Sequence, residues 1–313
     1  MQITFLGTGA VERVPDPWCR CSYCQEARRR GGCNVRLSSS LLINDDLLID
    51  AGPDIAAAAG RLGCDLTLVQ ALLVTHPHDD HLDKGTLGAR HREWGGTPLP
   101  LLTVYGGWDS LSLIDNWDAL RLRPHALAPF EHVQIQTGGW LAPDPRNPRY
   151  SGVPPLAGDL PQTASRRYEV FTLAARHGTA EPMLFVIQQV EGSEVNASAG
   201  HQALLYATDT GPFTERTWAF LDDLSRAGLR LAATVLDATM GVGREGHGSA
   251  EHLSLEEMIA HQHELEQHHL LTDDCLRLAH HFSHYFTPPH EELEALLAPH
   301  GIQPVYDGLT FQI

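Results

Sequence analysis

The segment THPHDDH, residues 75–81, follows directly on the apolar run VQALLV and places three histidines and two aspartates where a strand ends. A chain turns sharply after a buried strand, so side chains two positions apart can converge on one point. Imidazole and carboxylate groups are ligands for divalent zinc, manganese or iron. We therefore interpret this H-x-H-x-D-H loop, in preference to a solvated polar turn, as half of a metal site with four candidate ligands: His76, His78, Asp80 and His81.

Three further candidates also follow apolar runs that read as strands. His177 comes after TLAAR, Asp209 after ALLYAT, and His281 ends the run LRLAHH. We expect two metal ions at this site. The predicted ligands of the first ion are His76, His78 and His177, those of the second are Asp80, His81 and His281, and Asp209 bridges both.

This ordered series resembles the metallo-β-lactamase superfamily, and the resemblance covers most of the chain. It implies an α/β fold, an αββα sandwich of two mixed β-sheets flanked by helices, with the dinuclear site where both sheets end. By itself the motif does not choose among the hydrolysis of β-lactams, thioesters, phosphodiesters or RNA. The resemblance also suggests that Asp50 orients the histidines, and Asp237 is a similar candidate; both also read as ordinary strand-end aspartates.

A second cluster, WCRCSYC, carries three cysteines in the spacing C-x-C-x-x-C. A closed structural zinc site needs a fourth ligand, and His284 lies three residues after His281. This arrangement resembles the PhnP-like branch, the phosphoribosyl cyclic phosphate diesterases. The resemblance implies a structural zinc ion held by Cys19, Cys21, Cys24 and His284, and the spacing to His284 favours His281 over its neighbour His280 as the catalytic ligand. Three reduced thiols in a loop are the alternative.

The resemblance also implies two catalytic residues. In phosphodiesterases of this superfamily a histidine near the start of a late helix contacts the phosphate or protonates the leaving group, and His252 in GHGSAEHLSLEEM takes that place here. His247 is the rival, and a surface position for either histidine stays open. Asp80, besides binding metal, helps to aim the nucleophile.

Charge and composition limit the classes of substrate and partner that the chain can bind. The chain has 22 lysines and arginines against 39 acidic residues, a formal net charge of −17, and such a surface repels nucleic acid. A small phosphodiester, cyclic in particular, therefore fits better than RNA. The alternatives are an RNase Z-like nuclease, which would need a basic arm, a flavodiiron-type oxidoreductase, which usually has glutamate at the place of His78, and a non-catalytic relative of the PQQ-biosynthesis proteins.

The remaining expectations concern organisation and location. We predict one domain over residues 1–313, with a Pro/Gly-rich excursion at about 126–167. The start MQITFLGTG reads as a strand rather than a signal peptide, and no apolar run is long enough to span a membrane, so a cytoplasmic protein is expected. A homodimer is possible on the sequence alone, and zinc, manganese and iron are all candidates for the native catalytic metal. Strands are predicted at 101–105, 168–175, 183–190, 202–208, 231–236 and 304–312, and helices at 214–227, 253–265 and 290–298.

Overall fold

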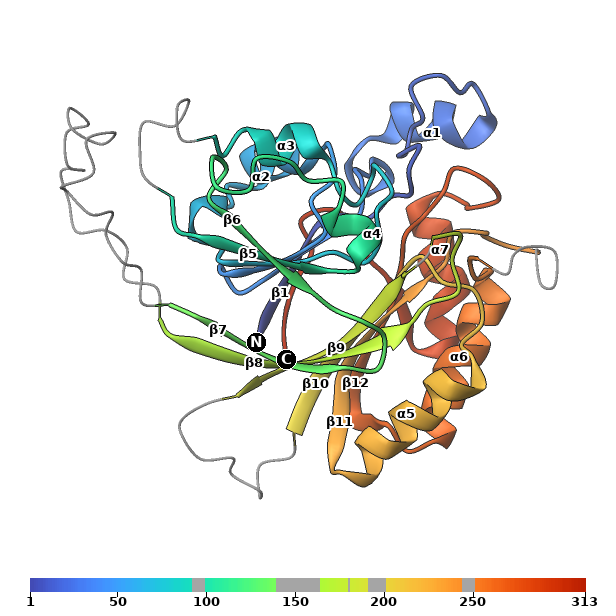
Figure 1. Cartoon of the computed structure of the whole chain (residues 1–313). Coiled ribbons are helices and arrows are strands. Elements are labelled where there is room, and N and C mark those ends of the chain that lie inside the picture. Colours follow the sequence, from blue (N-terminus) through green and yellow to red (C-terminus); the bar gives the residue numbers. More distant parts are fainter. Residues whose placement is uncertain (92–98, 139–163, 180, 191–200, 244–250) are drawn as a thin grey trace.

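The computed structural model describes residues 1–91, 99–138, 164–179, 181–190, 201–243 and 251–313. Two seven-stranded sheets face each other, and helices cover their outer sides (Figure 1). This is the predicted αββα sandwich of two mixed sheets. No helix within the described ranges is both long and apolar enough to cross a membrane.

The first sheet has the strand order β14-β1-β2-β3-β4-β5-β6. The strands from β3 to β6 run parallel, and β14, β1, β2 and β3 pair antiparallel. Their bounds are β1 Gln2–Gly7, β2 Ser40–Ile43, β3 Leu47–Ile49, β4 Ala71–Leu73, β5 Leu102–Gly106, β6 Leu122–Ala126 and β14 Thr310–Gln312.

The second sheet has the order β13-β12-β11-β10-β9-β8-β7. The strands β10 to β13 are parallel, whereas β7 to β10 pair antiparallel. Their bounds are β7 His132–Thr137, β8 Arg166–Ala174, β9 Met183–Val190, β10 His201–Ala207, β11 Leu229–Asp237, β12 Leu271–His280 and β13 Ile302–Pro304.

The helices pack on the outer faces. Helix α2 contacts β1 of the first sheet, while α5, α6 and α7 contact β11, β12 and β13 of the second. The helices are α1 Ser22–Arg30, α2 Ile55–Leu62, α3 Lys84–Gly88, α4 Trp108–Leu111, α5 Glu215–Arg226, α6 Leu255–Gln267 and α7 His290–Leu297, with short 3-10 turns at Gly32–Asn34, Leu66–Leu68 and Ala298–His300.

The alternation of side chains along β2 and β3 explains why the first sheet is covered on both faces. Leu41 and Ile43 point into the core between the sheets, whereas Leu42 points to the outer cluster under α2. In a strand, successive side chains face opposite sides, so an uninterrupted apolar run fits a sheet that is buried twice. The runs SLLI and LLI therefore form the centre of the sandwich.

Two predicted segments differ from the structure. The strand expected at 304–312 is wrong as one element: β13 and β14 lie in different sheets, because Gly308 (φ 95°) turns the chain across the sandwich. Most of the excursion expected at about 126–167 lies outside the described residues. Within it, His132–Thr137 form the regular strand β7, since Ile135 and Thr137 are buried and alternate with more exposed polar side chains.

Candidate metal centre

The predicted ligands lie where the carboxyl ends of several strands meet. The strands β3 and β4 of the first sheet are parallel, and β8, β10, β11 and β12 of the second all run in one direction. Their carboxyl ends therefore reach the same edge of each sheet, the usual place for ligand sites in parallel sheets. The loop after β4 carries His76 to His81, while His177, Asp209 and His281 follow β8, β10 and β12.

The first group of predicted ligands is His76, His78 and His177. The Nδ1 atom of His78 lies 3.0 Å from Nε2 of His76 and 3.1 Å from Nε2 of His177. Two imidazole nitrogens bound to one tetrahedral zinc ion at about 2.0–2.1 Å are separated by about 3.3 Å. His76 is buried whereas His78 is exposed, so this side of the centre faces solvent.

The second group is Asp80, His81 and His281, and it is fully buried. Asp80 Oδ2 lies 3.1 Å from Nε2 of His81 and 3.9 Å from Nε2 of His281. His280 does not belong to the group: it is buried, and its Nε2 atom faces the carbonyl oxygen of Gly7 at 3.2 Å. The preference for His281 over His280 therefore agrees with the geometry.

Asp209 stands between the two groups. Its Oδ1 atom lies 3.9 Å from Nε2 of His177, whereas its Oδ2 atom lies 3.1 Å from Nε2 of His81 and 2.9 Å from Nε2 of His281. One carboxylate oxygen thus faces each group, which is the arrangement that a bridging ligand requires.

The donor atoms fit a cation better than they fit one another. Within the described residues, His81 Nε2, His281 Nε2 and Asp209 Oδ2 are buried and form no hydrogen bond of acceptable geometry, although they are about 3 Å apart. Buried polar atoms are normally paired. These atoms converge on a common point instead of bonding each other, so the residues present fit divalent metal ions.

The charges of the centre point the same way. Burial opposes protonation of His281, but the carboxylate of Asp209 outweighs it and raises the pKa of His281 to about 10. Likewise Asp209 and Asp80 raise the pKa of the buried His81 well above its ordinary value. The carboxylates thus favour positive charge at this place, and a bound metal ion would supply that charge and displace the imidazole protons.

Backbone strain accompanies three of these strand ends. Asp50 (φ 59°), Asp209 (φ 54°) and His281 (φ 62°) all have left-handed backbone conformations. Such conformations are uncommon for residues other than glycine, and they concentrate at functional sites where surrounding structure holds them in place. The sharp left-handed step turns each side chain from the strand direction toward the centre.

Asp50 supports the first sheet's ligands. It is fully buried, its Oδ2 atom lies 2.7 Å from Nδ1 of His81, and its Oδ1 atom accepts the backbone N–H of Thr75 at 2.8 Å. The Thr75 hydroxyl also lies 3.0 Å from Nδ1 of His76. A carboxylate behind a metal-binding histidine orients its ring and raises its basicity. The suggested orienting role of Asp50 is thus supported by its contacts, whereas Thr75 carried no signal beyond its place beside the motif.

Asp237 has the same kind of position in the second sheet. Its Oδ1 atom accepts the backbone N–H groups of Thr239 and Leu253, and its Oδ2 atom lies 3.0 Å from Nδ1 of His252. The Thr239 hydroxyl lies 2.7 Å from Nδ1 of His281. Asp237 therefore holds together the turn behind a metal ligand and the candidate proton donor; sequence reasoning left Thr239 unnoticed.

His252 lies beside the predicted ligands, just before α6. A nitrogen of its ring lies within 4.8 Å of ligand atoms in His177 and Asp209, and the ring stacks on His281 with a centroid distance of 5.7 Å. Burial opposes protonation of His252, but the charge of Asp237 outweighs it and raises the pKa of His252. The rival His247 lies outside the described residues.

The cysteine cluster forms a separate group. The thiols of Cys19, Cys21 and Cys24 and a ring nitrogen of His284 all lie within 4.8 Å of one another. The Sγ atom of Cys21 lies 3.6 Å from Nδ1 of His284, close to the roughly 3.5 Å between sulfur and nitrogen on one tetrahedral zinc ion. Burial raises the pKa of Cys24 to about 12, whereas the Cys24 backbone N–H and the His284 ring outweigh burial and lower the pKa of Cys21 to about 7. The donor set fits a closed structural zinc site.

Gly52 offers a test of how tightly the loop of residues 75–81, which carries His76 to His81, is held in place. A Cβ atom at this position would lie 1.9 Å from the carbonyl oxygen of Asp80, so Gly52→Ala must displace the loop. We expect a loss of at least about 2 kcal/mol of unfolding free energy and weaker metal binding, measured by denaturation and by metal titration. The matched variant Gly60→Ala, exposed in α2 with nothing within 4 Å of its Cβ position, should gain about 0.5–1 kcal/mol. Equal effects of the two variants would contradict this account.

Comparison with known proteins places this geometry in a family. The family model of the β-lactamase superfamily domain matches residues 46–272. No curated protein sequence matches the chain significantly. Among solved structures, a diphosphatase of the PhnP family is 21% identical, with a TM-score of 0.66 and coverage of 100% of this chain and 97% of that one.

Two further structures share the fold. Zn²⁺-bound PqqB from Methylobacterium extorquens is 19% identical, with a TM-score of 0.64 and full coverage of both chains. The short form of human tRNase Z is 16% identical, with a TM-score of 0.54 and coverage of 100% of this chain and 99% of that one. At these identities the likeness establishes the fold alone. The family match and the sandwich together show that the chain belongs to the β-lactamase superfamily and has the fold of its metallo-hydrolases.

Proposed function

We propose that this protein is a metal-dependent phosphodiesterase that hydrolyses small phosphodiesters, cyclic ones such as phosphoribosyl cyclic phosphate in particular. The observation that carries the proposal is the complete set of ligand positions with the His252–Asp237 pair beside it. The likeness to a PhnP-family diphosphatase supports the PhnP-like branch.

The residues divide into holding and proton-transfer roles. His76, His78 and His177 would hold one metal ion, Asp80, His81 and His281 the other, and Asp209 both. When bound, such ions polarise phosphate oxygens and lower the pKa of a water molecule toward neutrality. Asp80, which lies 3.1 Å from His81 in the second group, would help to aim the attacking oxygen. As the bond from phosphorus to the leaving oxygen breaks, His252 donates its proton to that oxygen, and Asp237 keeps its ring oriented.

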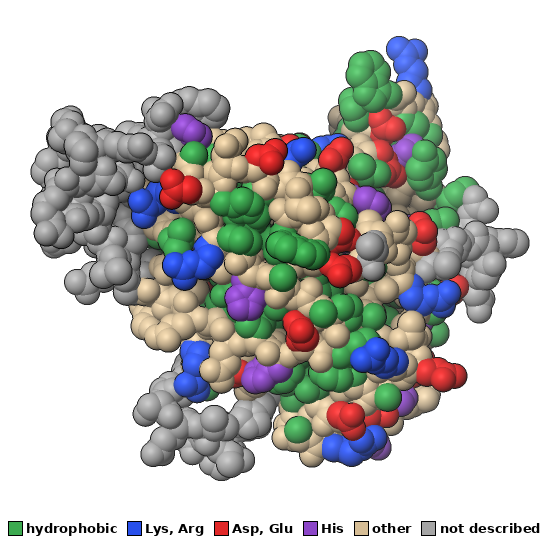
Figure 2. Space-filling view, in the orientation of Figure 1, with side chains coloured by type: hydrophobic (Ala, Val, Ile, Leu, Met, Phe, Trp, Pro, Cys, Tyr) green, Lys and Arg blue, Asp and Glu red, His purple; other side chains and the backbone are tan. Residues whose placement is uncertain are grey.

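A nuclease would need a basic surface, and the clearest cationic run of the sequence, Arg28 to Arg30, does not provide one. Arg28 donates to the carbonyl oxygens of Cys19 and Asp16, and Arg29 and Arg30 pair with Glu26. On the face shown in Figure 2, lysine and arginine side chains are scattered among acidic ones. These contacts favour a small substrate over the RNase Z-like alternative.

The test combines metal content with hydrolysis. Protein purified without added metal is analysed for zinc, manganese and iron, and bis(p-nitrophenyl) phosphate is assayed beside a five-membered cyclic phosphate of ribose and a nucleoside diphosphate. About three metal ions per chain and cleavage of the cyclic phosphate are expected. One zinc ion per chain and no hydrolysis with any added metal would favour a non-catalytic relative of the PQQ-biosynthesis proteins, and cleavage of the diphosphate alone would contradict the diesterase.

His252→Ala tests the proton donor. Loss of general acid catalysis is expected to lower kcat about 100-fold for an alkyl phosphodiester, but much less for a p-nitrophenyl ester, whose leaving group needs no proton. The measurement is kcat for both substrates at equal metal occupancy. His263→Ala, at an exposed position of α6, is the control and should change neither value. An equal loss of kcat for both substrates would assign His252 to metal or phosphate binding instead.

A further inference from the structure

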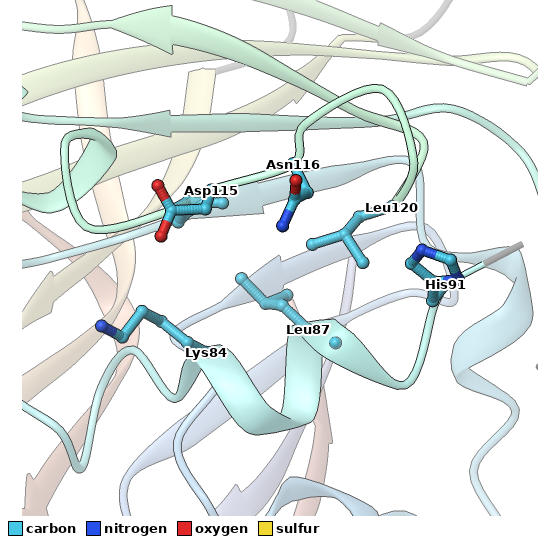
Figure 3. A pocket seen from close by; sticks show the side chains of 8 residues that line it. Lys84, Leu87, His91, Asp115, Asn116 and Leu120 are labelled. Atoms are coloured by element: carbon cyan, nitrogen blue, oxygen red, sulfur yellow. The ribbon is translucent and has the colours of Figure 1, made fainter.

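A cavity of about 240 Å³ lies apart from both metal groups, between α3 and the segment 114–120 on the first sheet's side of the molecule. Figure 3 shows the side chains that line it. The apolar part of its lining is Leu87, Ile114 and Leu120, which also belong to the cluster under the outer helices. The polar part is Lys84, His91, Asp115 and Asn116. No residue that we assign to the metal centre lines this cavity.

One end of the cavity carries two opposite charges. Lys84, the only lysine in the sequence, begins α3, and Asp115 lies across from it at the same end (Figure 3). Within the described part of the chain neither side chain forms a hydrogen bond, and no ion pair within 4.0 Å joins them. Opposite charges that share one end of a cavity without neutralising each other complement a ligand that carries both signs.

The rest of the cavity complements an apolar body. The side chains of Leu87 and Leu120 point toward each other across it, and the amide of Asn116 reaches in above them (Figure 3). Asn116 has a left-handed backbone (φ 57°), a conformation that asparagine tolerates better than most residues. His91 closes the end opposite Lys84 and Asp115.

We propose that this cavity binds a free α-amino acid with an aliphatic or aromatic side chain. The ligand's carboxylate would pair with Lys84, its ammonium group with Asp115, and its side chain would cover Leu87 and Leu120. The cavity, about 240 Å³ in volume, has room for a ligand of leucine's size. A simple carboxylic acid would leave Asp115 facing its anion, and a simple amine would leave Lys84 facing its cation.

The single lysine makes a direct measurement possible. Reductive methylation with ¹³C-formaldehyde labels only Lys84 and the N-terminal amine, so two methyl signals appear in the NMR spectrum. Titration with L-leucine should shift the Lys84 signal saturably, with a midpoint near about 1 mM because exposed ion pairs are weak. The signal of Met1, whose amine contacts Ile313 at the paired β1–β14 end, should stay unchanged and serves as the internal reference.

Analogues and variants separate the proposed contacts. In calorimetry on unmodified protein, 4-methylpentanoate and isoamylamine, each lacking one charge, should bind at least about tenfold more weakly than leucine. Asp115→Asn and Lys84→Met should each weaken leucine binding at least about fivefold, whereas Asp274→Asn, at an exposed site in β12, should not. The proposal is overturned by the absence of saturable binding of leucine, isoleucine or phenylalanine up to about 20 mM. Equal binding of 4-methylpentanoate, or unchanged binding by Asp115→Asn, would overturn it as well. The result does not depend on the hydrolytic activity.

Discussion

Asp209→Ala is expected to lower kcat/KM for the phosphodiester by at least about 10³-fold. This carboxylate faces both ligand groups, with Oδ1 toward His177 and Oδ2 toward His81 and His281. On the proposed function, its removal takes away a ligand of each of the two proposed ions. It also leaves the two histidines of the second group without the carboxylate that raises their pKa. A loss of several kcal/mol of transition-state stabilisation corresponds to a rate change of this size.

Metal analysis makes this prediction specific. Asp209→Ala should lose metal from the catalytic centre but keep about one zinc ion per chain, because the cysteine cluster is separate. Asp209→Asn, similar in shape but uncharged, should have a metal content between those of Asp209→Ala and the wild type. The control is Asp274→Ala, which changes an exposed aspartate in the first half of β12, and it should match the wild type. Full metal occupancy in Asp209→Ala with unchanged kcat/KM would disprove the bridging role.

Cys24→Ser is expected to remove the proposed structural zinc ion and to lower the Tm by about 10 °C or more. Cys24 is fully buried beside Cys21 and His284, and binding of a structural zinc ion contributes directly to the free energy of folding. The loss should reach the catalytic centre as well, because His284 follows His281 by three residues. We expect kcat/KM to fall about tenfold even when the catalytic ions are resupplied.

The control for this variant is Cys64→Ser. Cys64 lies outside the cluster and packs at the edge of the outer core, so its replacement should keep the zinc content and change the Tm by only a few degrees. Measurements of zinc per chain, Tm and activity on both variants decide the matter. If Cys24→Ser retains zinc and stability, the cluster is a set of reduced thiols, the alternative that the sequence left open.

The local pattern of the chain predicted much of the fold because burial is periodic. The segment SSLLINDDLLID, two apolar runs around a polar turn, predicts a hairpin and forms β2 and β3. The segment from Asp54 to Gly63 predicts a helix and forms α2, which ends at the left-handed Gly63. Ser254 caps α6 in a capping box with Glu257. Asp54 is different: it makes no cap bond to α2 and instead accepts from Arg13 and Ser38. A polar side chain near a helix start has several donors within reach, and only the packed structure selects one.

The types and order of the candidate ligands can be predicted from the sequence, because a histidine or aspartate follows the point where each apolar run stops. Which of these residues meet depends on tertiary packing, since His78 and His177, 99 positions apart, come within 3.1 Å through the packing of two sheets. The same packing produces the supporting contacts of Thr75 and Thr239 and places Lys84 and Asp115 at one cavity. Hydrogen bonds and charges between distant segments leave no periodic trace along a chain, and they exist only once the sheets have packed.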